Sequence, residues 1–169
     1  MDATRKNISR WIIFFMIMLF LSGLTAIPAE TGLAFATRLF PLGTAVGDWL
    51  DKVYLALHDT NNQYPFLAYG YDWLAFAHFV LAILFIGPLK DPVRNKWVIE
   101  FGLIACLLII PFALIAGHFR SIPFWWRLVD CSFGIIGLLP LSICLKKINQ
   151  LVSININTDQ QWKQPYRRP

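Results

Sequence analysis

GHFRSIPFWWRLVD, residues 117–130, joins two long apolar runs and decides how this chain folds. The runs cover residues 97–117 and 124–145, and each is long enough to cross a bilayer as a helix. The short linker between them predicts a helical hairpin. Arg127 and Asp130 lie where the second run has already begun. Because charge inside a membrane span is costly, we expect these two residues to have a partner or a function.

Two further apolar runs, residues 11–28 and 67–87, extend the pattern to four spans. The chain is 57% hydrophobic, more than the roughly half that is typical of soluble domains. The first run has the basic flank of a secretory signal, but its apolar stretch is longer than usual, so we predict a retained span. The predicted fold is an all-α integral membrane protein, a four-transmembrane-helix bundle that forms one membrane domain over residues 1–169.

Positive charge is distributed unequally between the two ends of these spans. One side carries eleven of the 15 Lys and Arg residues, namely Arg5, Lys6, Arg10, Lys90, Arg94, Lys96, Lys146, Lys147, Lys163, Arg167 and Arg168. Because basic loops stay on the cytoplasmic side, this bias predicts that both termini are cytoplasmic. Residues 146–169 are polar and are expected to form a cytoplasmic tail.

The segment at residues 29–66 is then extracytoplasmic. Its apolar residues recur at spacings of three and four, with charged residues between them. This pattern predicts one or two amphipathic helices, broken near Pro41-Leu42-Gly43.

Several functional classes find no support in the sequence. No basic stripe with interleaved aromatic residues indicates nucleic-acid binding. The three cysteines, Cys106, Cys131 and Cys144, all lie in apolar runs and form no C-x-x-C pair, so we expect packing residues and no disulfide framework. No metal-ligand spacing is present, and no metal site is predicted.

Ionisable and polar residues gather at the predicted outer ends of the spans. This one-sided cluster supplies the candidate ligand-binding residues, which are His78, Asp130, Arg127, Asp72, Glu30, Tyr71 and His118.

Two helix faces are expected to bring part of this cluster together. Arg127 and Asp130 are i,i+3 neighbours, and their face continues through Gly134 and Gly137, which permits close approach of another helix. A second face carries Tyr71, Ala75, His78 and Ala82. If the two faces meet, His78, Asp130 and Arg127 border one outward-facing pocket.

Structural interpretations of the same residues remain open. Arg127 and Asp130 can form an ion pair that only sets the register of the fourth span, and Asp72 can cap the second. A neutral His78 bonded to a carbonyl would need no ligand, and His118 can be an ordinary interface residue.

The leading functional hypothesis is the binding of a lipid-like or amphipathic small molecule in an outward-facing polar pocket between the helices. Membrane lipid is the expected environment, and no cofactor is identified. A second hypothesis is a membrane enzyme in which His78 acts as acid or base, oriented by Asp72, Asp130 or Glu30. Its other catalytic residues are not readable from the sequence.

A third hypothesis is an electron-transfer subunit that holds haem b between His78 and His118. A fourth is an accessory subunit of a larger membrane complex, or a homo-oligomer. Nothing in the sequence excludes the accessory subunit or the homo-oligomer.

The layout of four spans, cytoplasmic termini and a long segment after the first span resembles the sterol- and drug-binding EXPERA proteins. In that family, acidic residues near the lumenal ends of the spans contribute to a buried cavity. The resemblance implies that Glu30 is the nearest counterpart here, with Asp51 or Asp72 as a second acid. It covers the topology and no specific motif, and the short turn at residues 117–123 departs from the longer connections of that family.

Overall fold

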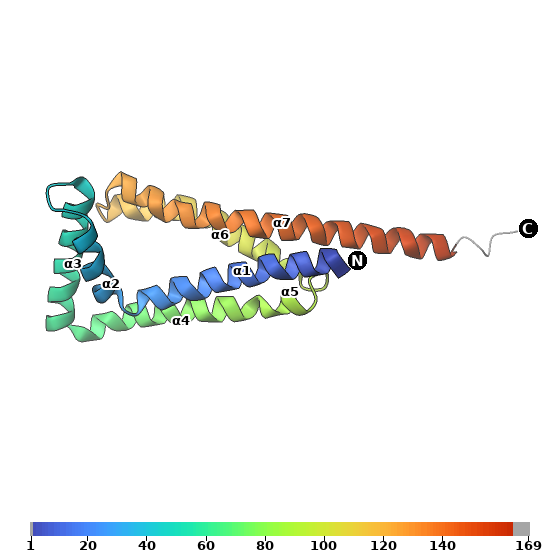
Figure 1. Cartoon of the computed structure of the whole chain (residues 1–169), viewed down its shortest axis with the longest axis horizontal. Helices are drawn as coiled ribbons and strands as arrows, with labels where there is room; N and C mark the ends of the chain where they lie inside the picture. The colour runs from blue at the N-terminus through green and yellow to red at the C-terminus, as the bar shows by residue number, and fades with distance from the viewer. Residues whose placement is uncertain (1, 164–169) are drawn as a thin grey trace, which may run out of the picture. The chain divides into compact units, whose positions relative to one another are not determined.

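The structure is a computed structural model that describes the backbone of residues 2–163 and the side chains of residues 3–154. Figure 1 shows that the described chain consists of helices. These are α1 (Asp2–Ala26), α2 (Ala29–Leu39), α3 (Ala45–Gln63), the 3-10 helix η1 (Pro65–Ala68), α4 (Tyr69–Leu84), α5 (Ile86–Lys90), α6 (Lys96–Phe119) and α7 (Phe124–Lys163). The predicted all-α class is confirmed for these residues.

Four of the described segments are long and apolar enough to cross a membrane. They are Ala3–Ala26, Pro65–Lys90, Lys96–Phe119 and Phe124–Ile154. A helix of 24 residues is about 36 Å long, more than the roughly 30 Å of a bilayer's hydrocarbon core. Large apolar side chains along them are exposed, among them Ile17, Ile83, Leu108 and Leu139.

The chain divides into two compact units. The first comprises Met1–Met16 and Leu84–Pro169, and the second comprises Ile17–Ile83.

In the first unit, α6 packs closely against α7 through small residues. A methyl group added to Gly134 would lie 2.5 Å from the carbonyl oxygen of Cys106, and one added to Gly137 would lie 2.7 Å from the sulfur of Cys106. Both distances are far below van der Waals contact, so no larger residue fits without movement. The predicted close approach at Gly134 and Gly137 is confirmed.

Helix α7 is longer than the apolar run that predicted it. It continues past residue 145 to Lys163, so much of the stretch expected to be a polar tail is helical. Ile148 and Leu151 are buried at a helical spacing from Leu141 and Cys144, and this apolar stripe extends the helix beyond the predicted apolar run. Residues 164–169 of the predicted tail lie outside the described residues.

In the second unit, the C-terminal part of α1 packs against α4 at Gly23. A methyl group there would lie 2.8 Å from Cβ of His78 and 2.9 Å from the carbonyl oxygen of Ala75. The rings of Phe20 and Phe79 lie 4.9 Å apart beside this contact. The α4 face predicted from its small residues is therefore a packing face.

The predicted break in the segment at residues 29–66 is confirmed. Helices α2 and α3 are separated at residues 40–44, where Gly43 adopts a φ of 87° that other residues rarely take. The hydroxyl of Thr44 accepts a hydrogen bond from the amide of Gly47 at 3.0 Å and so caps α3. The carboxylate of Asp48 accepts from the amide of Gly43 at 2.8 Å.

The second apolar segment gains residues at both ends. The 3-10 helix η1 leads directly into α4, and α5 continues to Lys90 beyond Pro88, where the apolar run ends. The inclusion of residues 67–71 lengthens this segment to Pro65–Lys90, enough for a span.

Candidate functional site

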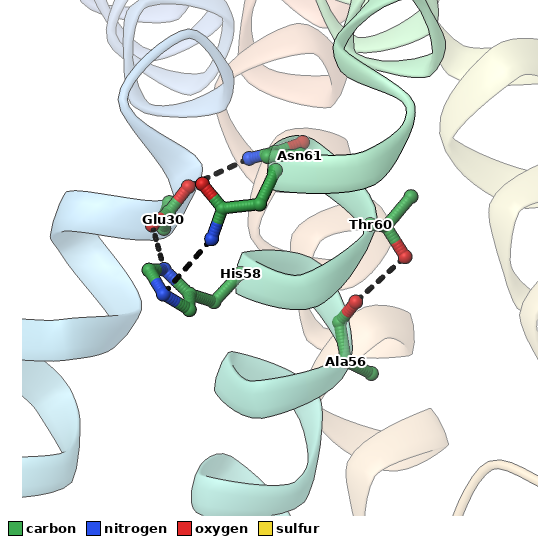
Figure 2. A network of polar contacts seen from close by, with 6 residues as sticks. Glu30, Ala56, His58, Thr60 and Asn61 are labelled. Atoms are coloured by element: carbon green, nitrogen blue, oxygen red, sulfur yellow. Dashed lines mark hydrogen bonds and ion pairs between the residues drawn. The ribbon is translucent and has the colours of Figure 1, made fainter.

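A polar cluster joins α2 to α3 within the second unit, as Figure 2 shows. Nδ1 of His58 lies 2.6 Å from Oε1 of Glu30, and the amide nitrogen of Asn61 donates to Oε2 of Glu30 at 2.7 Å. Both carboxylate oxygens are therefore held by α3. We name Glu30, His58, Asn61 and Asn62 the Glu30 cluster.

The second ring nitrogen of His58 also has a polar neighbour. Nδ2 of Asn62 lies 3.0 Å from Nε2 of His58. Because the ionised carboxylate of Glu30 can only accept, the contact between Glu30 and Nδ1 of His58 is a hydrogen bond donated by Nδ1. The ring of Tyr54, one helical turn earlier, stacks on His58 with a centroid distance of 5.8 Å.

The cluster is partly open to solvent and retains negative charge. The side chains of His58 and Glu30 are 45% and 34% exposed. Hydrogen bonds from His58 and then from Asn61 lower the pKa of the Glu30 carboxyl below its ordinary value of 4.5. Glu30 is also in the first turn of α2, where the helix dipole favours an anion. The carboxylate is therefore ionised at neutral pH.

Local sequence places these groups on facing surfaces. Pro28 precedes α2, so Glu30 is fixed at the start of that helix. His58 and Asn62 are four residues apart in the last turns of α3, and Asn61 follows His58 at a spacing of three. Such spacings put all three on one side of α3.

Among the predicted site residues, His78 has a local backbone partner. Its Nδ1 lies 2.8 Å from the carbonyl oxygen of Leu74, four residues earlier in α4. Since a carbonyl oxygen only accepts, Nδ1 of His78 donates this hydrogen bond. This contact is the carbonyl bond that the sequence allowed for His78.

Tyr71 and Asp72 occupy the first turns of α4. Tyr71 is half-buried, whereas Asp72 is exposed and lines a surface hollow with Tyr69, Trp73 and Phe76.

Arg127, Asp130 and His118 belong to the first unit. The ion pair expected between Arg127 and Asp130 does not form among the described residues. Nε of Arg127 instead donates to the carbonyl oxygen of Ile122 at 2.8 Å, and its methylene stem fills the space above Gly117. The guanidinium is used to close the hairpin turn between α6 and α7. Asp130 is half-buried, and His118 is exposed beside Phe119.

The structure thus gives Glu30 partners that the sequence did not assign. His58 is 28 residues from Glu30, and only the antiparallel packing of α2 on α3 brings the two together. In the sequence, only the helical spacing of His58, Asn61 and Asn62 indicated that these three residues share one face of a helix. His78 lies in one unit, whereas Arg127 and Asp130 lie in the other, and the shared pocket stays a prediction.

No protein-family model, characterised protein or solved structure matches this chain.

Proposed function

We propose that the chain is an integral membrane protein that crosses the bilayer four times, with both termini in the cytoplasm. The exposed apolar side chains of the four long helices support insertion into a membrane, because the exposure of so much apolar surface to water is unfavourable. The distribution of Lys and Arg residues supports the orientation.

The N-terminal end of α1 supports the same orientation. Arg5, Lys6, Ser9 and Arg10 line one surface hollow, and the three basic residues make no ion pair within the described part of the chain. Unpaired cations suit the anionic surface of a cytoplasmic leaflet.

Helices α2 and α3 would then lie at the opposite, outer interface. Helix α2 exposes Phe35 and Leu39, and Leu42 is exposed in the loop that follows. A helix of this kind buries its apolar face at the boundary between headgroups and acyl chains.

We propose further that the protein binds an amphipathic small molecule with a cationic, hydrogen-bonding head at the Glu30 cluster. The observation that carries this proposal is an ionised, partly exposed carboxylate held between two interfacial helices. A carboxylate offers about four acceptor positions, and His58 and Asn61 use two of them. An ammonium group can therefore still bind.

Apolar contact for the rest of such a ligand is available on the same side of α3. Leu55 precedes His58 by three residues and is exposed, and Tyr54 stacks on the imidazole. A charged head bounded by apolar surface is the usual composition of a site for an amphipathic molecule.

The first prediction tests this site with a photoreactive long-chain primary amine as the probe. The substitution Glu30→Gln should reduce labelling of the membrane-embedded protein about tenfold, because a hydrogen bond to a charged group contributes about 1.5–3 kcal/mol. Asp59→Asn, which removes an exposed carboxylate next to His58 in α3, is the matched control and should label like wild type. Equal labelling of wild type and E30Q would refute the proposed site.

A second candidate function follows from the orientation of His58. A histidine whose Nδ1–H is held by a carboxylate has the orientation of a general base. Turnover of an ester amphiphile that His58→Gln abolishes, with amine labelling retained, would favour this enzyme over the binding protein.

A further inference from the structure

An aromatic hollow lies on one face of α4, in the second unit and apart from the Glu30 cluster. Tyr69, Asp72, Trp73 and Phe76 line a space of about 240 Å³. Their spacings of three and four place all of them on one side of the helix. Trp73 meets Tyr69 edge to face at 5.8 Å between ring centroids and Phe76 at 5.5 Å.

The hollow combines aromatic rings with one carboxylate. Asp72 makes no ion pair within the described residues, and Trp73 is 55% exposed. Aromatic faces attract cations, and quaternary ammonium groups are the ligands for which such surroundings are best known. A quaternary ammonium has no N–H to donate, so it is satisfied by ring faces and by the charge of Asp72.

The size of the hollow indicates a headgroup and not a whole ligand. Pockets for drug-sized molecules occupy about 300–1,000 Å³, more than is available here.

The same face of α4 continues as an apolar stripe. Val80 and Ile83 follow Phe76 at spacings of four and seven, and both are exposed. Ile83, the farther of the two, lies about 16 Å along the helix from Asp72, in the direction of the middle of the proposed span. A lipid chain can run over them while its headgroup occupies the hollow.

We propose that Tyr69, Asp72, Trp73 and Phe76 bind the phosphocholine headgroup of a membrane lipid, whose chain lies along Val80 and Ile83. The proposal rests on the membrane insertion argued above and not on the Glu30 cluster. Asp72 and the rings hold the quaternary ammonium, and the hydroxyl of Tyr69 and the indole N–H of Trp73 can donate to the phosphodiester.

The test measures lipid retention by native mass spectrometry of the full chain, purified in a detergent that has no choline head. Phosphatidylcholine, phosphatidylethanolamine and phosphatidylglycerol with identical chains are the probes. Wild type should retain phosphatidylcholine over phosphatidylethanolamine by about threefold to tenfold. Trp73→Leu and Asp72→Asn should each bring that ratio close to one. Because the readout is a ratio within one sample, a loss of folded protein does not imitate the effect.

Trp97→Leu provides the matched control, because Trp97 at the start of α6 is 57% exposed and lies in the other unit. It should leave the ratio unchanged. The proposal is overturned if wild type shows no headgroup preference, or if W97L lowers the ratio as much as W73L does. It is also overturned if W73L lowers retention of all three lipids equally, since Trp73 would then be a general interfacial anchor. Glu30→Gln should not alter the ratio, so this site and the amine site can fail separately.

Discussion

Glu30 connects two helices through a single carboxylate. It links α2 to α3 through His58 and Asn61, and it remains exposed enough to meet a ligand. Its two neighbours stabilise the charged form, so the link depends on the protonation state of Glu30.

The second prediction concerns the pH dependence of this link. The pKa of Glu30 is lowered in the folded protein, so its contribution is complete above the ordinary value of 4.5 and is lost as the pH falls through the lowered pKa. Wild type should melt above E30Q at neutral pH, and the two melting temperatures should converge in acid. Circular dichroism in detergent micelles measures both. A constant difference at every pH would contradict the assigned partners.

At the scale of elements, small residues permit the close packing of α6 on α7 and of α1 on α4. Gly134 and Gly137 admit Cys106 of α6, and Gly23 of α1 admits the α4 backbone. If the helices lie in a membrane as proposed, such close approach supplies van der Waals contact where the hydrophobic effect between helices is absent. Arg127, which the sequence presents as a candidate binding residue, closes the turn of this hairpin.

The third prediction tests the α6–α7 contact. Gly134→Ala should cost about 1–3 kcal/mol of stability, because the added methyl group would overlap the carbonyl oxygen of Cys106. Thermal melting in micelles should report the loss. Gly70→Ala is the control, since nothing lies within 4 Å of a methyl group at that position of α4, and it should melt no lower than wild type. Equal melting of wild type and G134A would mean that the two helices separate readily.

At the scale of the whole molecule, the proposed orientation makes different surfaces available on the two sides of a membrane. The α2–α3 segment would face outward, and the turn between α5 and α6 would face the cytoplasm. The three native cysteines are buried, so they give little background in a labelling experiment.

The fourth prediction uses exposed positions on the two proposed sides. A membrane-impermeant maleimide added to intact cells should label Asp59→Cys and should label Arg94→Cys only after permeabilisation. The reverse pattern would invert the topology, and labelling of both variants in intact cells would contradict four spans.

Much of the fold follows from local patterns in the chain. The four apolar segments, the break near Gly43 and the close approach at Gly134 were all predictable, because length, turn chemistry and small-residue spacing act over a few residues. The extension of α7 was missed because it depends on Ile148 and Leu151, which are too widely spaced to read as an apolar run.

The candidate site was likewise predictable only in part from the sequence. Sequence alone predicts that ionisable residues gather at one end of the four apolar segments and that Glu30 and Asp72 are among them, since composition and helical spacing are local properties. The pairing of Glu30 with His58 and the carbonyl bond of Arg127 required tertiary structure. Each depends on which groups meet across a helix contact or a turn, and many partners are compatible with one sequence until the chain is packed.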